Sequence, residues 1–320
     1  MPFIPNAESD REEMLQAIGK RSVEELFSDV PARKRFPKLK LPRALSEQEV
    51  LREIGAMAAK NRGADKVSWF LGAGIYNHFI PALVPALASR GEFLTAYTPY
   101  QPEVSQGTLQ AIFEYQSMAA RLFGVSVVNA SHYDGATALA EAALMAWKLD
   151  EGRDKILLPE DLHPEYKAVL ETYFSSFDVE IAGYRGAPED AGVDGRCACL
   201  VAGYPCFSGE LHGLGRAAER AHAAGALFIV HADPLMCALL ESPGAQGADI
   251  VVAEGQSLGN PMNFGGPGLG MMGATEKLMR RMPGRIVGEA KDHDGRRGFV
   301  LTLTALEQHI RREKAVSNIC

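Results

Sequence analysis

Residues 227–255, LFIVHADPLMCALLESPGAQGADIVVAEG, contain the pattern that decides the fold class. They hold two short apolar runs, LFIVHAD and DIVVAEG, separated by a proline- and glycine-containing segment. Continuous apolar runs of this length are typical of strands buried on both faces of a parallel sheet. Similar runs occur at 155–160 (KILLPE), 179–185 (VEIAGYR), 197–203 (CACLVAG) and 268–274 (GLGMMGA), and VSWFLGAG at 67–74 also predicts a strand that enters a turn.

Helical patterns lie between these runs, at 106–124, 135–149, 164–177 and 214–225. The first of them ends at Gly124, a residue type favoured just after a helix. Strands that alternate with helices predict an α/β fold with a largely parallel sheet covered on both faces. Ligands in such folds gather at the carboxyl ends of the strands, so we expect site residues at 72–78, at 131–137, at Asp233 and at 251–270.

The first 66 residues predict a helical arm with three helix starts. Each start has a serine followed three residues later by a glutamate, as in a capping box: Ser9 with Glu12, Ser22 with Glu25, and Ser46 with Glu49. Between the last two lies a basic segment interrupted by prolines, VPARKRFPKLKLPRAL at 30–45. This composition favours an extended arm that packs on a partner subunit, followed by a main domain over residues 67–300.

Composition narrows the function classes. The net charge of −7 disfavours nucleic-acid binding, because neutralising phosphates requires a basic excess. No basic and apolar leader begins the sequence, and no apolar run approaches the ~20 residues that span a bilayer. The five cysteines lack the spacing of zinc or redox motifs; alternation along a strand points Cys197 and Cys199 to one face, and we expect reduced core cysteines. The prediction is a cytoplasmic protein.

Two strand exits together suggest a cofactor site. The helix start at Gly135–Thr137 can bind a phosphate or be an ordinary helix start. Asp233 can pair with a protonated ring nitrogen or cap the next turn. These are parts of a pyridoxal-phosphate site in the aspartate-aminotransferase-like fold (fold type I), in which a lysine is expected near Gln256. No lysine occurs between Lys167 and Lys277, so the covalent anchor is missing.

The loop FLTAYTPYQPEVSQGTLQ, residues 93–110, concentrates polar and aromatic side chains around two prolines. Rigid polar loops before a helix often line sites, although the tyrosines can also pack on another subunit. The candidates there are Tyr97, Thr98, Tyr100, Gln101 and Glu103. LGAGIYNHFIP at 71–81 lacks the third glycine of a dinucleotide-binding turn, and its His78 is either a site residue or structural. His163 and His222 are predicted to be structural.

Several segments together resemble one family. They are FLGAGIYNHFIP (70–81), YTPYQPEVSQGTLQAIFEYQ (97–116), YDGATALAEA (133–142), HADPL (231–235), PGAQGADIVVAEGQSLGNPMNFGGPGLG (243–270) and LEQHIRREKAVSNIC (306–320). The sequence resembles the first subunit of glycine dehydrogenase (decarboxylating), the P-protein of the glycine cleavage system in its two-subunit bacterial form.

The resemblance implies a subunit without its own Schiff-base lysine. The second subunit would hold pyridoxal phosphate, and the two would form a heterodimer that pairs into a heterotetramer. The enzyme decarboxylates glycine and transfers the aminomethyl group to the lipoyl arm of the H-protein. The loop residues named above and His78 would position glycine and shape the lipoyl channel at the subunit interface. Thr137, Asp233 and Gln256 would be remnants of an ancestral cofactor site, and neither a cofactor nor a metal is expected on this chain.

Two alternatives stay open. The chain can be a structural or regulatory pseudoenzyme that only stabilises its partner, or a free-standing pyridoxal-phosphate enzyme that uses a distant lysine. Members of the family continue beyond the SNIC motif at which this chain stops. Residues 301–320 are therefore expected to begin a connection to a small C-terminal domain, in a fragment or a truncated product.

Overall fold

The structure is a computed structural model, and it describes residues 6–94, 97–303, 310 and 312. The chain divides into two compact units, Met1–Val67 and Ser68–Cys320. Most of the segment LEQHIRREKAVSNIC, and with it most of the expected connection at 301–320, lies outside the described residues. Within the described part, no helix is both long and apolar enough to cross a membrane.

The described part of the first unit is helical and contains α1 (Glu8–Ala17), η1 (Val23–Phe27), η2 (Ala32–Lys34) and α2 (Glu47–Ala58), where η denotes a 3-10 helix. The capping box at Ser46 is confirmed, because Ser46 Oγ accepts from the Glu49 N–H at 3.3 Å while Glu49 accepts from the Ser46 N–H at 2.8 Å. The box predicted at Ser9 is wrong. The helix is capped two residues earlier, at Ala7, and Asp10 accepts the Ala7 N–H. Ser22 precedes a 3-10 helix and makes no side-chain cap.

The second unit is built on a seven-stranded sheet with the order β1-β7-β6-β5-β4-β2-β3. Its strands are β1 (Val127–Val128), β2 (Lys155–Pro159), β3 (Glu180–Tyr184), β4 (Cys197–Tyr204), β5 (Leu227–Ala232), β6 (Ile250–Glu254) and β7 (Gly270–Ala274). All neighbouring pairs from β3 to β6 are parallel, whereas β7 runs antiparallel to both β6 and β1. The predicted α/β fold with a largely parallel sheet is confirmed.

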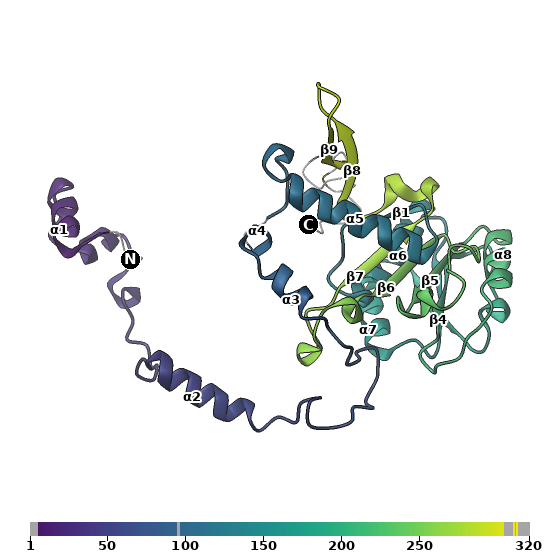
Figure 1. Cartoon of the computed structure of the whole chain (residues 1–320), viewed down its shortest axis with the longest axis horizontal. Helices are drawn as coiled ribbons and strands as arrows, with labels where there is room; N and C mark the ends of the chain where they lie inside the picture. The colour runs from purple at the N-terminus through teal and green to yellow at the C-terminus, as the bar shows by residue number, and fades with distance from the viewer. Residues whose placement is uncertain (1–5, 95–96, 304–309, 311, 313–320) are drawn as a thin grey trace. The chain divides into compact units, whose positions relative to one another are not determined.

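Helices cover both faces of this sheet (Figure 1). One apolar core lies between the sheet and helices α6 (Gly135–Leu149) and α7 (Pro164–Phe174), and contains Leu139, Ile229 and Phe174. A second core lies against α5 (Gln106–Phe123) and α8 (Gly215–Ala223), and contains Phe123 and Phe228. Helix α5 is followed by Gly124, whose φ of 70° is left-handed, as the sequence predicts.

A separate two-stranded hairpin, β8 (Ile286–Lys291) with β9 (Arg297–Thr302), packs against α5. Gln106 connects the start of α5 to this hairpin, donating to the Phe299 carbonyl at 2.8 Å and accepting from the Phe299 N–H at 2.9 Å. The remaining short elements are α3 (Leu83–Ala88), α4 (Gly91–Leu94), η3 (Pro102–Val104), η4 (Pro188–Asp190), η5 (Met236–Ala238), η6 (Gln256–Leu258), η7 (Asn263–Gly265) and η8 (Glu276–Arg281).

Two sequence predictions about strands are wrong. Residues 67–74 form no strand: Phe70 is 92% exposed, and no strand among the described residues pairs with the segment. The thiols of Cys197 and Cys199 do not share a face, because they belong to the two opposite cores. The β2–β4 register shifts between these cysteines, and such an extra residue reverses the alternation. Both are nevertheless buried free thiols.

Candidate functional site

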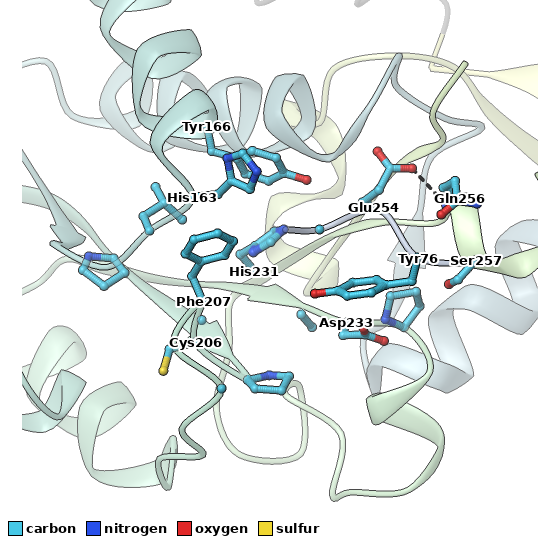
Figure 2. Close-up of a pocket in the computed structure, with 18 residues that line it drawn as sticks. Tyr76, His163, Tyr166, Cys206, Phe207, His231, Asp233, Glu254, Gln256 and Ser257 are labelled. Carbon is cyan, nitrogen blue, oxygen red and sulfur yellow. Dashed lines mark hydrogen bonds between the residues drawn. The ribbon is translucent and has the colours of Figure 1, made fainter. Parts of the chain in front are cut away.

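A cavity of about 190 Å³ opens at the carboxyl ends of the central strands (Figure 2). Pro159 of β2, Gly203 of β4, Ala232 of β5 and Glu254 of β6 each contribute to its wall. In the strand order, β3 and β5 lie on opposite sides of the β2–β4 pair, so the chain reverses direction across the sheet at this point. The cavity therefore lies where open α/β sheets place their ligands.

One wall of the cavity is aromatic. The ring of His163 lies 5.3 Å from Tyr166 and 4.9 Å from Phe207, and Tyr166 lies 4.8 Å from His231. His163 Nδ1 accepts the Glu165 N–H at 3.1 Å, so Nε2 carries the proton and donates to the Ala73 carbonyl at 3.0 Å. The imidazole is thus held in one orientation. His163 caps α7, as a structural residue would, and it also forms part of the site.

His231 points into the same cavity from β5 (Figure 2). Its Nε2 atom is buried and makes no hydrogen bond within the described part of the chain. Burial lowers the pKa of His231 to about 4, although the charge of Asp233 opposes this effect. The ring is therefore neutral at pH 7.

Asp233 follows β5 and also lines the cavity. Its Oδ1 atom accepts the N–H groups of Leu235 at 2.8 Å and Met236 at 3.2 Å. The sequence left open whether this carboxylate caps the next turn or pairs with a ring nitrogen. The cap is present, and the carboxylate also lies at the cavity wall.

The start of α6 already holds two carboxylates. Glu254 Oε2 accepts the Gly135 N–H at 2.9 Å, and Asp134 Oδ1 accepts the Thr137 N–H at 2.8 Å. The other oxygen of Glu254 accepts the N–H groups of Gln256 at 2.9 Å and Leu269 at 2.8 Å. Free N–H groups at a helix start attract a phosphate, but here they are hydrogen-bonded to anions of the chain itself. A phosphate at Gly135–Thr137 would be repelled by both.

Gln256 occupies the place at which a lysine is expected. It lies two residues beyond β6, is buried, and donates from Nε2 to the Asn260 carbonyl at 2.6 Å. An amide cannot form the covalent bond that a lysine amine forms with a pyridoxal aldehyde. Together with the two carboxylates at the start of α6, this means that the residues present do not fit pyridoxal phosphate.

The other predicted site residues lie away from this cavity, on segments that precede α5. Tyr97 is 84% exposed and Tyr100 is 52% exposed, while Thr98 and His78 are partly buried. Gln101, which caps η3, and Glu103, which lies within it, are exposed. His78 packs edge-on against Tyr76 at 6.3 Å, and Tyr76, not His78, lines the cavity.

Tyr100 has a definite partner within the chain. Its hydroxyl accepts a hydrogen bond from Arg285 Nη2 at 2.7 Å, and the guanidinium also lies over its ring at 5.3 Å from the centroid. The base of the loop is anchored by Gln106, which donates to the Pro102 carbonyl at 2.7 Å. The loop is therefore held at one end while Tyr97 projects into solvent.

The comparisons with known proteins agree with this fold. The family described as glycine cleavage system P-protein matches residues 1–320. The chain belongs to this family. It is 50% identical to the probable glycine dehydrogenase (decarboxylating) subunit 1 of Desulforamulus reducens and 52% identical to that of Parvibaculum lavamentivorans. In both cases the alignment covers 100% of this chain and 73% of the relative.

Solved structures give the same result. A crystal structure of glycine decarboxylase (P-protein) of the glycine cleavage system, in inhibitor-bound form, matches with a TM-score of 0.92 and 49% identity, over 100% of this chain and 73% of that one. A sphingosine-1-phosphate lyase from Burkholderia pseudomallei, with a TM-score of 0.53 and 16% identity, shares the fold alone. Membership in the P-protein family makes this chain a subunit of a glycine-decarboxylating enzyme, in a family that depends on pyridoxal phosphate.

Sequence reasoning missed Glu254, His231, Tyr166 and Phe207. Glu254 ends an apolar run, and only its position beside a distant helix start shows its role. His231 was available as a signal, because a histidine within the buried run LFIVHAD is a polar group that needs an explanation.

Proposed function

We propose that this chain is the subunit of glycine decarboxylase that holds no cofactor and shapes the active site at the interface with a second subunit. The second subunit carries pyridoxal phosphate, and the aminomethyl group left after decarboxylation passes to the lipoyl arm of the H-protein. The observation that supports this division is the pair Glu254 and Gln256. One fills the anion site at the start of α6, and the other replaces the lysine.

The loop residues supply the interface wall in this proposal. Tyr97 and Glu103 are exposed side chains whose chemistry suits a small zwitterion such as glycine. The aromatic face of Tyr97 and the carboxylate of Glu103 both attract its positively charged ammonium group. Tyr100 is held by Arg285, so its ring is oriented before the partner binds. Thr98, Gln101 and His78 would add hydrogen-bonding groups around glycine and the lipoyl channel.

The helical arm, residues 1–66, is proposed to pack on a partner subunit, with residues 67–300 as the main domain. Its extended segment exposes large apolar side chains, including Leu39 at 70% and Leu41 at 73%. A covered arm would remove this apolar surface from water. We propose a heterodimer that pairs into a heterotetramer, located in the cytoplasm.

The decisive experiment is glycine–bicarbonate carbon exchange in the presence of H-protein. Exchange is expected only when this chain and the second subunit are combined, and visible cofactor absorbance is expected only with the second subunit. If this chain alone gains cofactor absorbance and borohydride fixes the cofactor to it, the proposal is wrong.

A substitution separates the proposal from a purely structural pseudoenzyme. Glu103→Gln is expected to lower exchange at least tenfold while co-purification with the second subunit is unchanged, because removing one positioned charge typically costs this much or more. Glu171→Gln on the exposed surface of α7 is the matched control. Equal exchange in both variants would support a subunit that only stabilises its partner.

A further inference from the structure

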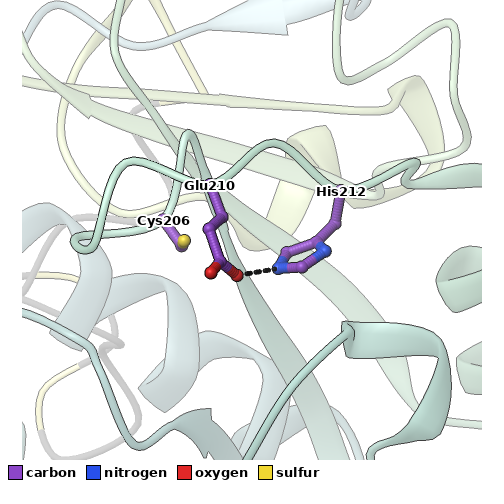
Figure 3. Close-up of side chains that lie close together, drawn as sticks. All are labelled: Cys206, Glu210 and His212. Carbon is purple, nitrogen blue, oxygen red and sulfur yellow. Dashed lines mark ion pairs between the residues drawn. The ribbon is translucent and has the colours of Figure 1, made fainter.

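A cysteine, a glutamate and a histidine converge in the loop that follows β4 (Figure 3). The Cys206 sulfur, a carboxylate oxygen of Glu210 and a ring nitrogen of His212 all lie within 4.8 Å of one another. The Glu210 and His212 atoms are 3.5 Å apart. The family function described above does not use any of these three side chains.

The backbone brings these groups together without help from an ion. The Cys206 N–H donates to the Glu210 carbonyl at 3.0 Å, and the Gly209 N–H donates to the Cys206 carbonyl at 2.9 Å. Gly209 has a φ of 91°, which a residue with a side chain rarely adopts. This closed turn places Cys206 beside Glu210, and His212 follows two residues later. A preformed arrangement lowers the entropic cost of binding a ligand.

One pair of these groups already has the separation expected around a tetrahedral metal ion. Two metal–ligand bonds of about 2.1 Å at a tetrahedral angle place their ligand atoms about 3.4 Å apart, close to the separation of Glu210 and His212. A thiolate with an imidazole selects borderline and soft ions, whereas magnesium and calcium prefer oxygen ligands. We propose that Cys206, Glu210 and His212 form a zinc-binding site with three protein ligands.

Neighbouring groups are placed to complete such a site. Ser208 Oγ lies 3.0 Å from the Cys206 sulfur and donates to Asp161 Oδ2 at 2.8 Å. Asp161 thus lies beside the cluster as a further carboxylate, and water can take the remaining position. On binding, the Cys206 thiol loses its proton to solvent, the zinc–sulfur bond forms, and no redox change is needed.

The site would act on the cavity through Phe207. This residue lies between Cys206 and Ser208, and its ring packs on His163 in the cavity wall. Figure 2 shows Cys206 and Phe207 side by side at the edge of the cavity. A metal ion on Cys206 would therefore fix the aromatic wall of the cavity.

The test uses the full chain, freed of metal by a chelator and titrated with Co²⁺ as a coloured substitute for Zn²⁺. We expect one equivalent to produce a thiolate-to-cobalt charge-transfer band with tetrahedral visible bands, and Zn²⁺ to remove both. Cys206→Ser should abolish the charge-transfer band, and His212→Asn should weaken binding at least about tenfold, the loss that even outer-shell changes cause.

Matched controls lie elsewhere in the chain. Cys237→Ser changes another buried free cysteine, and His293→Asn changes an exposed histidine on the β8–β9 hairpin. Neither should alter the titration, and circular dichroism shows which variants are folded. If the wild-type chain gives no charge-transfer band, or if the band persists in Cys206→Ser and in His212→Asn, the ion is bound adventitiously and the proposal is overturned.

Discussion

The cavity around Glu254 and the loop from Tyr97 to Glu103 differ in how their polar groups are satisfied. Glu254 accepts three backbone N–H groups, from the nearby Gln256, from Leu269 and from the distant Gly135. Tyr97, by contrast, is 84% exposed, and Glu103 is exposed as well. Substitutions in a network whose hydrogen bonds are all made lower the free energy of unfolding. Substitutions in an exposed loop instead affect the contacts that the loop makes with another molecule. Charged residues in a cavity therefore do not by themselves identify the residues that act on a substrate.

The largest effect is expected for Glu254→Ala. The change leaves the N–H groups of Gly135, Gln256 and Leu269 without their acceptor, and hydrogen bonds to a charged group contribute roughly 1.5–3 kcal/mol each. Because Glu254 is partly exposed and water can replace some of these bonds, we expect a loss of about 4 kcal/mol in the free energy of unfolding. Urea denaturation measures it, with Glu171→Ala as the exposed control.

The same variant tests whether Glu254 occupies an anion site. Glu254→Ala should be stabilised by inorganic phosphate more than by chloride at equal ionic strength, because the vacated N–H groups can bind the phosphate. The wild-type chain should show no such preference. An equal response of the two proteins would contradict the role assigned to Glu254.

The second-largest effect is the loss of stability in acid that His231 causes. Burial lowers the pKa of His231 to about 4, against an unfolded value of about 6.5. Between these values the unfolded chain binds one more proton than the folded chain, so stability falls as the pH falls. The pKa shift corresponds to a contribution of about 3 kcal/mol to the free energy of unfolding. This contribution is fully present above pH ~6.5 and is lost by pH ~4.

His231→Asn should lower by one the number of protons that the chain takes up on unfolding in this pH range, so its stability should depend less steeply on pH. The measurement is the free energy of unfolding in urea from pH 7 to pH 5, for the wild type and the variant. His132, whose pKa burial also lowers to about 4, keeps the remaining slope in the variant. Identical slopes in the two proteins would mean that His231 does not stay neutral in the folded chain.

The third effect belongs to the loop and concerns activity. Tyr97→Ala is expected to reduce carbon exchange in the two-subunit enzyme about 100-fold, the cost of a misplaced substrate, and to change the free energy of unfolding by less than about 0.5 kcal/mol. Leu239→Ala is the control, because Leu239 is also largely exposed, at 77%. It should leave both the exchange rate and the free energy of unfolding unchanged. A Tyr97 variant that loses stability but keeps its exchange rate would reverse the comparison between loop and cavity.

The smallest effect is expected for Tyr100→Phe. The ring and its contact with Arg285 remain, while the hydrogen bond from Arg285 at 2.7 Å is lost. For this half-exposed pair we expect the loss of the hydrogen bond to cost about 1 kcal/mol, which corresponds to a fewfold decrease in the rate of carbon exchange. Tyr100→Ala, which also removes the ring, should lose more, and equal losses would show that the hydroxyl alone matters.

Much of the fold could be predicted from local sequence. Apolar runs such as LFIVHAD and DIVVAEG give the strands, and the helix from Gln106 ends at Gly124 as predicted. Each of these features depends on residues close together in the chain. The prediction for 67–74 failed because the apolar side chains of this run are exposed and, in the part of the chain that the structure describes, no strand pairs with it. The local pattern does not show this.

The sequence by itself determined that an α/β sheet forms and that no lysine follows β6 at Gln256. Only the tertiary structure decided what takes the place of the phosphate. Glu254 and Gly135 are 119 residues apart, and their 2.9 Å contact exists because β6 and the start of α6 meet at the same edge of the sheet. The convergence of Cys206, Glu210 and His212 likewise depends on a turn closed by Gly209. Side-chain chemistry is encoded residue by residue, whereas proximity is set by packing.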